Sequence, residues 1–318
     1  PPDPFVADLI GDTPWDETLS GAAAALALGG TNTGWLDGHE VQWAAFRAGW
    51  PHPILSYAMQ RTERGESPND LVSNLAIPPG ASLGLARARA SSTDTWVLIV
   101  GKPLIEVPPF AREHQPGDSL TLTVTDTGGW AEFEVLASSP SGQLHIGNPI
   151  EFDEKGEWVV EIQGLKGQGR SNLLRAPIYV GVPVPVAPPI EQRRPITHDK
   201  EEILELALDG IAEIRELVGV SRVKPEPMLE ASARKALAEW MDGQIISDSQ
   251  ARMASLGYPN AEVAEIRCHA VSVNACLDDL YWSVDSRPDL LDSQYSNVGV
   301  AAGLLRGNVV LVVDLAGE

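Results

Sequence analysis

Two glutamates near the C-terminal end of the chain, Glu262 and Glu265, are spaced as neighbours on one face of a helix. Two carboxylates can share general acid and general base work when unequal surroundings hold their pKa values apart. The same spacing is typical of two solvated acids on a helix surface. The sequence favours this simpler interpretation over a catalytic pair.

Cys268 and His269 are adjacent, which could place a thiol nucleophile beside an imidazole base. Neighbours in a strand point to opposite faces, so the two side chains cannot meet if this segment is extended. Cys268 and Cys276 could close a short loop as a disulfide worth about 2.5 kcal/mol. Two buried free thiols fit the sequence equally well. A disulfide would indicate an oxidising compartment.

Glycine clusters do not indicate a phosphate site in this chain. Gly128-Gly129 and Gly164–Gly169 are not followed by the start of a helix, so we expect hairpin turns there. The chain also lacks the His-Glu-x-x-His zinc motif. Neither nucleotide binding nor zinc-dependent hydrolysis is therefore predicted.

Composition limits the classes of partner. The 318 residues are too many for one compact core, so we expect two or three domains. Acidic residues outnumber basic ones by 44 to 23, and the net charge of −21 repels phosphate backbones. No apolar run approaches the roughly 18 residues of a membrane-spanning helix. The sequence predicts a globular protein with a solvated acidic surface that binds no nucleic acid and spans no membrane.

The first residues, Pro1-Pro2-Asp3-Pro4, include no initiator methionine and no signal-peptide pattern. We therefore expect a processed or trimmed chain. A removed N-terminal segment could have carried a secretion signal or a lipid anchor, which would fit the oxidising compartment that a disulfide implies.

Residues 1–103 show helix patterns followed by strand patterns. Apolar residues recur at helical spacing after Leu19, and Pro14 suits a first helical turn. We expect helices over 12–30, 40–47 and 67–75, and strands over 82–90 and 95–101. This order makes an α+β unit.

Residues 104–183 change to short segments in which apolar and polar residues alternate. Strands are predicted over 119–125, around Phe133, and over 143–146, 157–162 and 177–182. Short strands at regular spacing are typical of a β-sandwich. The proline-rich residues 184–198 that follow are expected to form a semi-rigid linker.

Residues 199–318 return to helices followed by strands. Helices are predicted over 201–218 and 227–242, and strands over 298–304 and 308–315. Four short motifs occur in the same order at both ends of the chain, and their offset stays between 208 and 215 residues. They are Leu19–Ala23, Ala48–Pro51, Ser82–Ala86 and Trp96–Gly101, then Leu229–Ala233, Leu256–Pro259, Asn297–Ala301 and Val310–Val313. We interpret the two ends as copies of one scaffold.

Four segments of the last unit resemble the CAP superfamily, the SCP and pathogenesis-related-1-like secreted domains, over about residues 198–318. They are Ile211–Arg215, Met228–Ala233 with Trp240-Met241, Leu256–Pro259 and Asn297–Val300. The first unit resembles a shorter, degenerate copy. The middle resembles the Ig-like sandwich that some bacterial proteins place before a CAP domain, with Ile178–Gly181 as its last strand. The resemblance implies a multidomain fold with CAP-like α-β-α sandwiches at both ends and an all-β sandwich between them.

The resemblance also implies a cleft in which two histidines and two acids can hold a divalent metal ion. This chain departs from that pattern, because Ser286 and Asp248 stand where the histidines are expected. Glu265 stands in the place of one glutamate. The first unit offers only His39-Glu40 and Ser67-Pro68-Asn69-Asp70. Hydroxyl and carboxylate groups alone make a poor transition-metal site, so we expect neither a metal nor another cofactor.

These features favour a non-enzymatic binding, adhesion or structural protein that is secreted or attached to the cell envelope. Its ligand would be a protein, a glycan or a lipid. A second hypothesis is a hydrolase or metal-dependent binder whose rearranged cleft uses Asp248, Glu265, His269 and Ser286. A third is a subunit of a larger extracellular assembly, which a proline-rich linker between discrete domains would suit.

Overall fold

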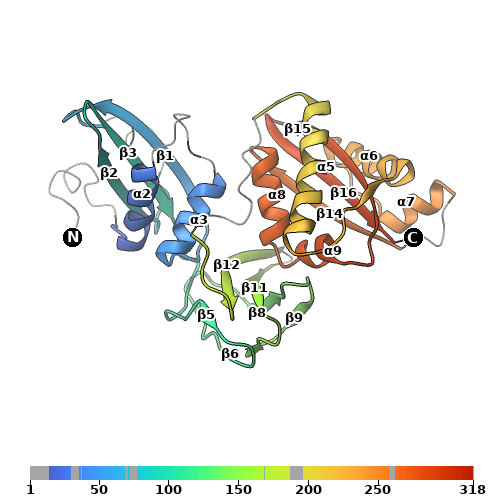
Figure 1. Cartoon of the computed structure of the whole chain (residues 1–318), viewed down its shortest axis with the longest axis horizontal. Helices are drawn as coiled ribbons and strands as arrows, with labels where there is room; N and C mark the ends of the chain where they lie inside the picture. The colour runs from blue at the N-terminus through green and yellow to red at the C-terminus, as the bar shows by residue number, and fades with distance from the viewer. Residues whose placement is uncertain are drawn as a thin grey trace.

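The computed structural model describes residues 14–29, 36, 38–68, 71, 77–167, 169–186, 196–257 and 262–317. It is a mixed α/β structure with several sheets. We call residues 14–103 the N-terminal part, 104–183 the middle part and 196–317 the C-terminal part. Figure 1 shows the middle part, in green, below the blue N-terminal part and the yellow to red C-terminal part.

The N-terminal part contains a three-stranded antiparallel sheet in the order β1-β3-β2. Its elements are α2 (Glu17–Gly29), α3 (Gly38–Ala48), β1 (Ile54–Glu63), β2 (Ser82–Arg89) and β3 (Thr93–Gly101). Helix α2 begins after Asp16, whose carboxylate accepts hydrogen bonds from the N–H groups of Thr18 and Leu19 at 2.8 and 2.9 Å. Pro14 therefore precedes the helix instead of occupying its first turn.

Strand β1 was not predicted, because its residues lack the alternation of a half-buried strand. Most of its ten residues are half-buried, with no regular change from buried to exposed. Most of the helix predicted over 67–75 lies outside the described residues, as do Gly30 and Tyr258-Pro259.

Among the described residues of the middle part, the regular elements are all strands. A five-stranded sheet has the order β5-β12-β11-β8-β9, and two small two-stranded sheets lie beside it. The strands are β4 (Ile105–Glu106), β5 (Glu113–His114), β6 (Ser119–Leu120), β7 (Thr125–Asp126), β8 (Glu132–Ser138), β9 (Leu144–Ile146), β10 (Ile150–Glu151), β11 (Gly156–Lys166) and β12 (Gly169–Val180). The prediction of a turn over the whole of Gly164–Gly169 is wrong, because Gly164 belongs to β11 and pairs with Ser171.

The C-terminal part has three layers around a four-stranded sheet in the order β13-β15-β16-β14. Helix α6 packs on one face, while α5 and α8 pack on the other (Figure 1). The elements are α5 (Lys200–Leu217), β13 (Lys224–Pro225), α6 (Pro227–Met241), α7 (Ser249–Ser255), β14 (Val263–Ala270), α8 (Val273–Trp282), α9 (Arg287–Leu291), β15 (Asn297–Leu305) and β16 (Asn308–Ala316).

Both long helices begin at acidic caps, since the side chains of Asp199 and Glu226 accept hydrogen bonds from the first backbone N–H groups of α5 and α6. Pro227 occupies the first turn of α6, where a missing N–H costs nothing.

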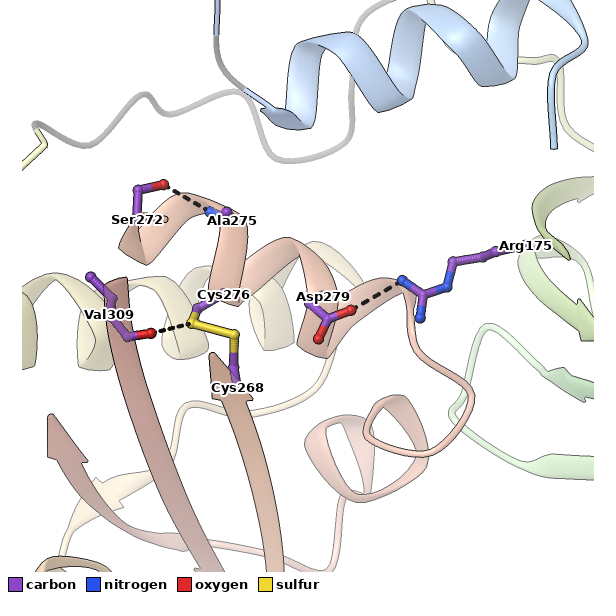
Figure 2. Close-up of a disulfide and its surroundings, with 7 residues drawn as sticks. All are labelled: Arg175, Cys268, Ser272, Ala275, Cys276, Asp279 and Val309. Carbon is purple, nitrogen blue, oxygen red and sulfur yellow. Dashed lines mark hydrogen bonds and ion pairs between the residues drawn. A yellow bond between two sulfur atoms is a disulfide. The ribbon is translucent and has the colours of Figure 1, made fainter. Parts of the chain in front are cut away.

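The bounds of strand β14 contradict the prediction that Glu262 and Glu265 share one face of a helix. The same strand contains Cys268 of the disulfide. Glu262 precedes β14 and Glu265 lies within it, so the two do not share a helical face. Cys268 is buried and His269, its neighbour, is exposed. Cys268 is bonded to Cys276 of α8, with Cα atoms 5.4 Å apart, and Figure 2 shows this bond joining helix and strand. The bond fixes α8 on the sheet.

One hydrophobic core connects all three parts. Trp43 and Phe46 of α3 contact Trp282 of α8, with ring centroids 6.0 and 5.7 Å apart. The same core cluster includes Leu136 and Val159 of the middle part. Val182 and Val184 also pack against it, so the proline-rich segment is attached to the core where it begins. Among the residues that the structure describes, no helix is both long and apolar enough to cross a bilayer.

Candidate functional site

Two glycines bring a helix directly onto a sheet at the two ends of the chain. A Cβ atom on Gly84 would overlap the backbone of Leu19 and Ser20 in α2. A Cβ atom on Gly299 would overlap the backbone of Leu229 and Glu230 in α6. Only a residue without a side chain permits this approach.

Each glycine lies in a row of three residues that pair across neighbouring strands of its sheet. The side chains of the two rows differ in chemistry. Gly84 pairs with Ile99, which pairs with Tyr57 across the N-terminal sheet. Gly299 pairs with Asp314, which pairs with Glu265 across the C-terminal sheet. The first row is apolar and aromatic, whereas the second carries two carboxylates.

Arg252 of α7 neutralises the acidic row. Its side chain is 1% exposed, and it contacts Glu265 closely and Asp314 at 3.5 Å. It also donates to Ser232 Oγ of α6 at 3.2 Å and to the backbone oxygen of Ser247. Arg267 forms a second ion pair with Glu265. These contacts join α6, α7, β14 and β16, so the polar groups serve packing.

Asp248 stands where one histidine is expected, and Ser247 precedes it. Both residues have structural partners. Glu239 accepts hydrogen bonds from the backbone N–H of Ser247 at 2.6 Å and from its hydroxyl at 2.8 Å. Asp248 caps α7 by accepting a hydrogen bond from the N–H of Ala251 at 3.1 Å. Both residues build the turn between α6 and α7.

His269 and Ser286 lie away from this network. His269 is four residues beyond Glu265 on β14, a separation of about 13 Å along a strand. It contacts the ring of Trp240, with centroids 6.4 Å apart. Ser286 precedes α9, which packs with α5 and α8 on the other face of the sheet, and its side chain caps no N–H group among the described residues. The structure thus groups Asp248 and Glu265 around Arg252 and leaves His269 and Ser286 apart.

Arg287, next to Ser286, joins the C-terminal part to the middle part. It is fully buried, lies 4.4 Å from the ring centre of Tyr281, and donates to the backbone oxygen of Glu157 at 3.0 Å. The hydroxyl of Tyr281 donates to the carboxylate of Glu157 at 2.7 Å. Arg287, which follows the second position where a histidine is expected, therefore belongs to the interface between the C-terminal part and the middle part.

Gly80-Ala81-Ser82-Leu83-Gly84 has the letters of the Gly-x-Ser-x-Gly motif of serine hydrolases. That motif works on a sharp turn between a strand and a helix. Ser82 instead begins β2, which continues into the hairpin with β3. The segment is not a nucleophile elbow.

Burial raises the pKa of Asp314, Glu157 and Glu161, although arginines lie beside each of them. A raised pKa means that the folded state binds the proton more tightly than the unfolded state. These groups therefore stabilise the fold below their ordinary pKa near 4, and that contribution is lost as pH rises through their folded pKa. We expect these three groups to lower the unfolding temperature as pH rises from about 4, as measured by calorimetry at constant ionic strength, whereas buried His52, whose pKa is lowered, acts in the opposite direction near its ordinary pKa of about 6.5.

The exposed Glu216 and the half-buried Glu239, whose pKa values are lowered by hydrogen bonds, are already ionised in this pH range and add no slope. The variant Asp314→Asn should flatten the pH dependence, whereas Glu205→Gln on the exposed side of α5 should leave it unchanged. A pH dependence that is the same in Asp314→Asn and the wild type would contradict the role assigned to Asp314.

A cavity of about 400 Å³ lies where the three parts meet, and we call it the junction cavity. Its wall includes Trp43 and Phe46 of α3, the segment Pro51–Ile54, Asn172 and Arg175 of β12, and Asp278, Asp279 and Trp282 of α8. A second cavity of about 420 Å³, between the N-terminal and middle parts, shares Phe46, Pro51 and His52 with it. Both volumes lie in the range of about 300–1,000 Å³ that is typical of small-molecule sites.

One side of the junction cavity is charged. Arg175 donates to Glu161 at 2.6 Å and to Asp279 at 3.2 Å, and Figure 2 shows Arg175 reaching from the middle part to Asp279 on α8. Two carboxylates thus balance one guanidinium, and Asp278 adds a further negative charge. The wall of the cavity also includes the aromatic residues Trp43, Phe46 and Trp282.

Several polar atoms of the cavity wall are buried without a hydrogen-bond partner in the described part of the chain. They are Trp43 Nε1, His52 Nδ1 and Asn172 Oδ1. Burial lowers the pKa of the His52 imidazole, and a hydrogen bond to the backbone of Leu173 opposes this shift. Unpaired buried polar groups each cost about 1–3 kcal/mol of stability.

Sequence reasoning missed the junction cavity entirely, because its residues come from three segments that lie about a hundred positions apart. Within the described ranges, no group of three or more histidine, cysteine or acidic side chains is arranged to hold a metal ion.

No protein-family model matches the sequence, and no curated protein is significantly similar to it. Among solved structures, it is similar to an outer surface protein from Borrelia burgdorferi, at 16% identity and a TM-score of 0.35 over 38% of this chain and 96% of that one.

It is also similar to a cysteine-rich secretory protein from Staphylococcus aureus, at 11% identity and a TM-score of 0.34 over 96% of this chain and 98% of that one. The similarity to Na-ASP-1 is 11% identity and a TM-score of 0.28 over 85% and 75%. The Staphylococcus aureus protein and Na-ASP-1 belong to the CAP superfamily. At these scores the similarities establish neither a family nor an activity for this chain.

Proposed function

We propose that the chain is a non-enzymatic binding protein of the cell surface or extracellular space that holds its ligand in the junction cavity. In this proposal residues 1–103 and 199–318 are two copies of one CAP-like scaffold, and residues 104–183 are an Ig-like sandwich between them. The observation that carries the proposal is the cavity itself, which all three parts line and where buried polar groups lack partners among the described residues.

The paired glycines support a common scaffold for the two ends. Gly84 and Gly299 make the same approach to a helix and lie in the same place within a strand hairpin. Gly49 and Gly257 follow α3 and α7 with φ values of +100° and +97°, as glycines that end helices often do. Such agreement in small residues is what a retained scaffold requires.

The structural bonds of the expected cleft residues support a role without catalysis. Glu265 is engaged by two arginines, Asp248 caps a helix, and Ser247 is held by Glu239. A general base must instead reach a substrate proton at about 2.6–3.2 Å. The bond between Cys268 and Cys276 supports an oxidising compartment, such as the extracellular space.

The absence of catalysis can be tested with the purified full chain. We expect no hydrolysis of peptide or ester substrates above the uncatalysed rate. Robust hydrolysis that disappears in Glu265→Gln, with the fold retained by circular dichroism, would overturn the proposal.

The location of the ligand site can be tested by filling the cavity. Ala275 of α8 lines it and is half-buried, so Ala275→Trp should occupy the space. Val271 is 59% exposed and precedes the same helix, which makes Val271→Trp a matched control. Arrays of glycans, peptides and lipids should show one class that binds the wild type and Val271→Trp but not Ala275→Trp. Binding that survives in Ala275→Trp would place the site elsewhere.

A further inference from the structure

Strand β9 is the last strand of the five-stranded sheet in the middle part, and its outer edge carries backbone groups that face away from the sheet. The oxygen of Gln143 accepts a backbone hydrogen bond from the residue that follows β8, and the N–H of Gly147 donates one to β8, at 2.9 and 3.0 Å. Bonded pairs alternate along an antiparallel ladder, so His145 also bonds to β8. The N–H and C=O groups of Leu144 and Ile146 then point outward. Within the described residues, no group is hydrogen-bonded to them.

The side chains of the same two residues are apolar and open to solvent. Leu144 is 44% exposed and Ile146 is 65% exposed. Ile146 pairs with Leu136, so both side chains point to the same face of the sheet. Leu136 is buried in the core that joins the middle part to the C-terminal part. The apolar face of the sheet therefore continues beyond that core and reaches the surface at β9.

Strand β9 differs from the other edge strands in charge. Native edge strands avoid pairing through charged side chains, proline or short length. The other edges of the three larger sheets each carry a charged residue, namely Arg61 in β1, Arg87 in β2, Glu113 in β5, Lys224 in β13 and Glu265 in β14. Strand β9 has three residues, and Val135–Ile150 around it contains no lysine, arginine, aspartate or glutamate. An added strand would meet no charged side chain on β9 and would gain a few hydrogen bonds, so its binding should be weak and reversible.

The outward groups of β9 fit an extended polypeptide. Leu144 and Ile146 each present one N–H and one C=O, and the two residues are about 6.7 Å apart along the strand. Another extended backbone carries donors and acceptors with this same repeat, which is how peptides add to the edge of a sheet. Residues of the added strand that lie opposite Leu144 and Ile146 share their face, so apolar side chains suit those positions.

Charge favours a basic segment as the added strand. The turn before β9 contacts α9, because a Cβ atom on Gly142 would lie 3.0 Å from the side chain of Leu291. Asp289 of α9 and Asp292 after it place negative charge beside this turn, and the whole chain has a net charge of −21. A second copy of the chain would bring the same negative charge. Figure 1 also shows the C-terminal part extending past β9 on the side of its outer edge, which leaves less room for a folded body than for a single strand.

We propose that β9 pairs with an extended segment of a partner protein that has apolar residues at alternate positions and lysine or arginine at its ends. The site is separate from the proposed ligand site, since no residue of β9 lines the junction cavity.

The test uses the synthetic peptide acetyl-Lys-Val-Thr-Val-Thr-Val-Lys-amide, titrated into the isotope-labelled full chain and followed by NMR. The largest shifts should occur at the amides of Leu144 and Ile146. When valines lie opposite these residues, the valine N–H groups face β9 and the threonine N–H groups face solvent. N-methylation of the central valine should weaken binding about 2- to 12-fold, the range for one neutral hydrogen bond. N-methylation of a threonine is the matched control and should leave the affinity unchanged.

Variants of the chain locate the contact. Ile146→Thr keeps the backbone groups and removes exposed apolar surface, so it should weaken peptide binding about three- to tenfold. Ile245→Thr is the matched control, because Ile245 is 97% exposed and lies in the turn after α6. Ala275→Trp, which fills the junction cavity, should also leave peptide binding unchanged. A peptide with glutamate in place of both lysines should bind several-fold more weakly.

Four outcomes would overturn the proposal: no binding at millimolar peptide, shifts centred away from β9, equal loss of affinity for the two N-methylated peptides, or binding that Ala275→Trp abolishes. Sedimentation of the chain without peptide tests the other occupant. A dimer that Ile146→Thr dissociates would make this edge an interface between two copies, and the peptide assignment would be wrong. None of these results bears on whether the junction cavity holds a ligand, so the proposed function is tested separately.

Discussion

Replacing Gly299 by alanine is expected to lower the free energy of unfolding by about 3 kcal/mol, near the upper end for overpacking a core. The added Cβ would overlap the backbone of Leu229 and Glu230, which cannot rotate away as a side chain can. Helix α6 must then move off the sheet and loosen its contacts with β15 and β16. Urea denaturation of both proteins would measure the difference.

Gly303 provides a matched control on the same strand and the same face. Its Cβ would lie 3.4 Å from the flexible side chain of Leu237, which is close to ordinary contact. Alanine is also better than glycine within a strand by about 0.5–1 kcal/mol, so Gly303→Ala should be neutral or stabilising. Gly84→Ala should cost about as much as Gly299→Ala. Equal effects of Gly299→Ala and Gly303→Ala would contradict the close packing of α6 on β15.

The elements that sequence predicted best are those whose own pattern shows which side is buried. Helix α5 was predicted over 201–218 and occupies Lys200–Leu217, because its apolar residues recur at helical spacing after the cap Asp199. The hairpin of β15 and β16 follows its apolar runs in the same way. Strand β1 was missed because it lacks alternation. Helix α8 was missed although its sequence carries a signal, since buried apolar residues recur at helical spacing from Val273 to Tyr281 after the cap Ser272.

The candidate site was less predictable than the fold. The sequence suggested, as an alternative hypothesis, that Asp248, Glu265, His269 and Ser286 share a cleft, whereas in the structure only Asp248 and Glu265 lie near Arg252. It could not show that Arg252 is buried, because an arginine on a short helix ordinarily points to solvent. The junction cavity depends on how α3, β12 and α8 meet, and no local pattern encodes that meeting.

Replacing Arg252 by methionine is expected to lower the free energy of unfolding by about 3–5 kcal/mol, the usual cost of removing one partner from a buried ion pair. Glu265 would keep Arg267, whereas Asp314, which is fully buried, would lose a cation 3.5 Å away. Ser232 and the backbone oxygen of Ser247 would lose their donor as well. Urea denaturation near neutral pH would measure the loss.

Arg234 of α6 is the control for this substitution. It forms an ion pair with Glu230 four residues away, and its side chain is 68% exposed. Exposed pairs contribute about 0–1 kcal/mol, so Arg234→Met should change stability little. Without Arg252, the pKa of Asp314 should rise further. The cost of Arg252→Met should therefore be smaller at acidic pH, where Asp314 is neutral. If Arg252→Met lowers the free energy of unfolding by the same amount at every pH, the loss of stability comes from packing and not from the ion pair with Asp314.

The N-terminal part indicates which second substitution should restore the stability that Arg252→Met loses. Ile99 occupies the strand position, relative to Gly84, that Asp314 occupies relative to Gly299. It is fully buried among apolar residues that need no ion pair. Replacing a buried ion pair by well-packed apolar side chains is often neutral or stabilising. Arg252→Met/Asp314→Ile should therefore recover most of the lost stability. If the double variant is no more stable than Arg252→Met, the two strand rows are not interchangeable and the case for one shared scaffold fails there.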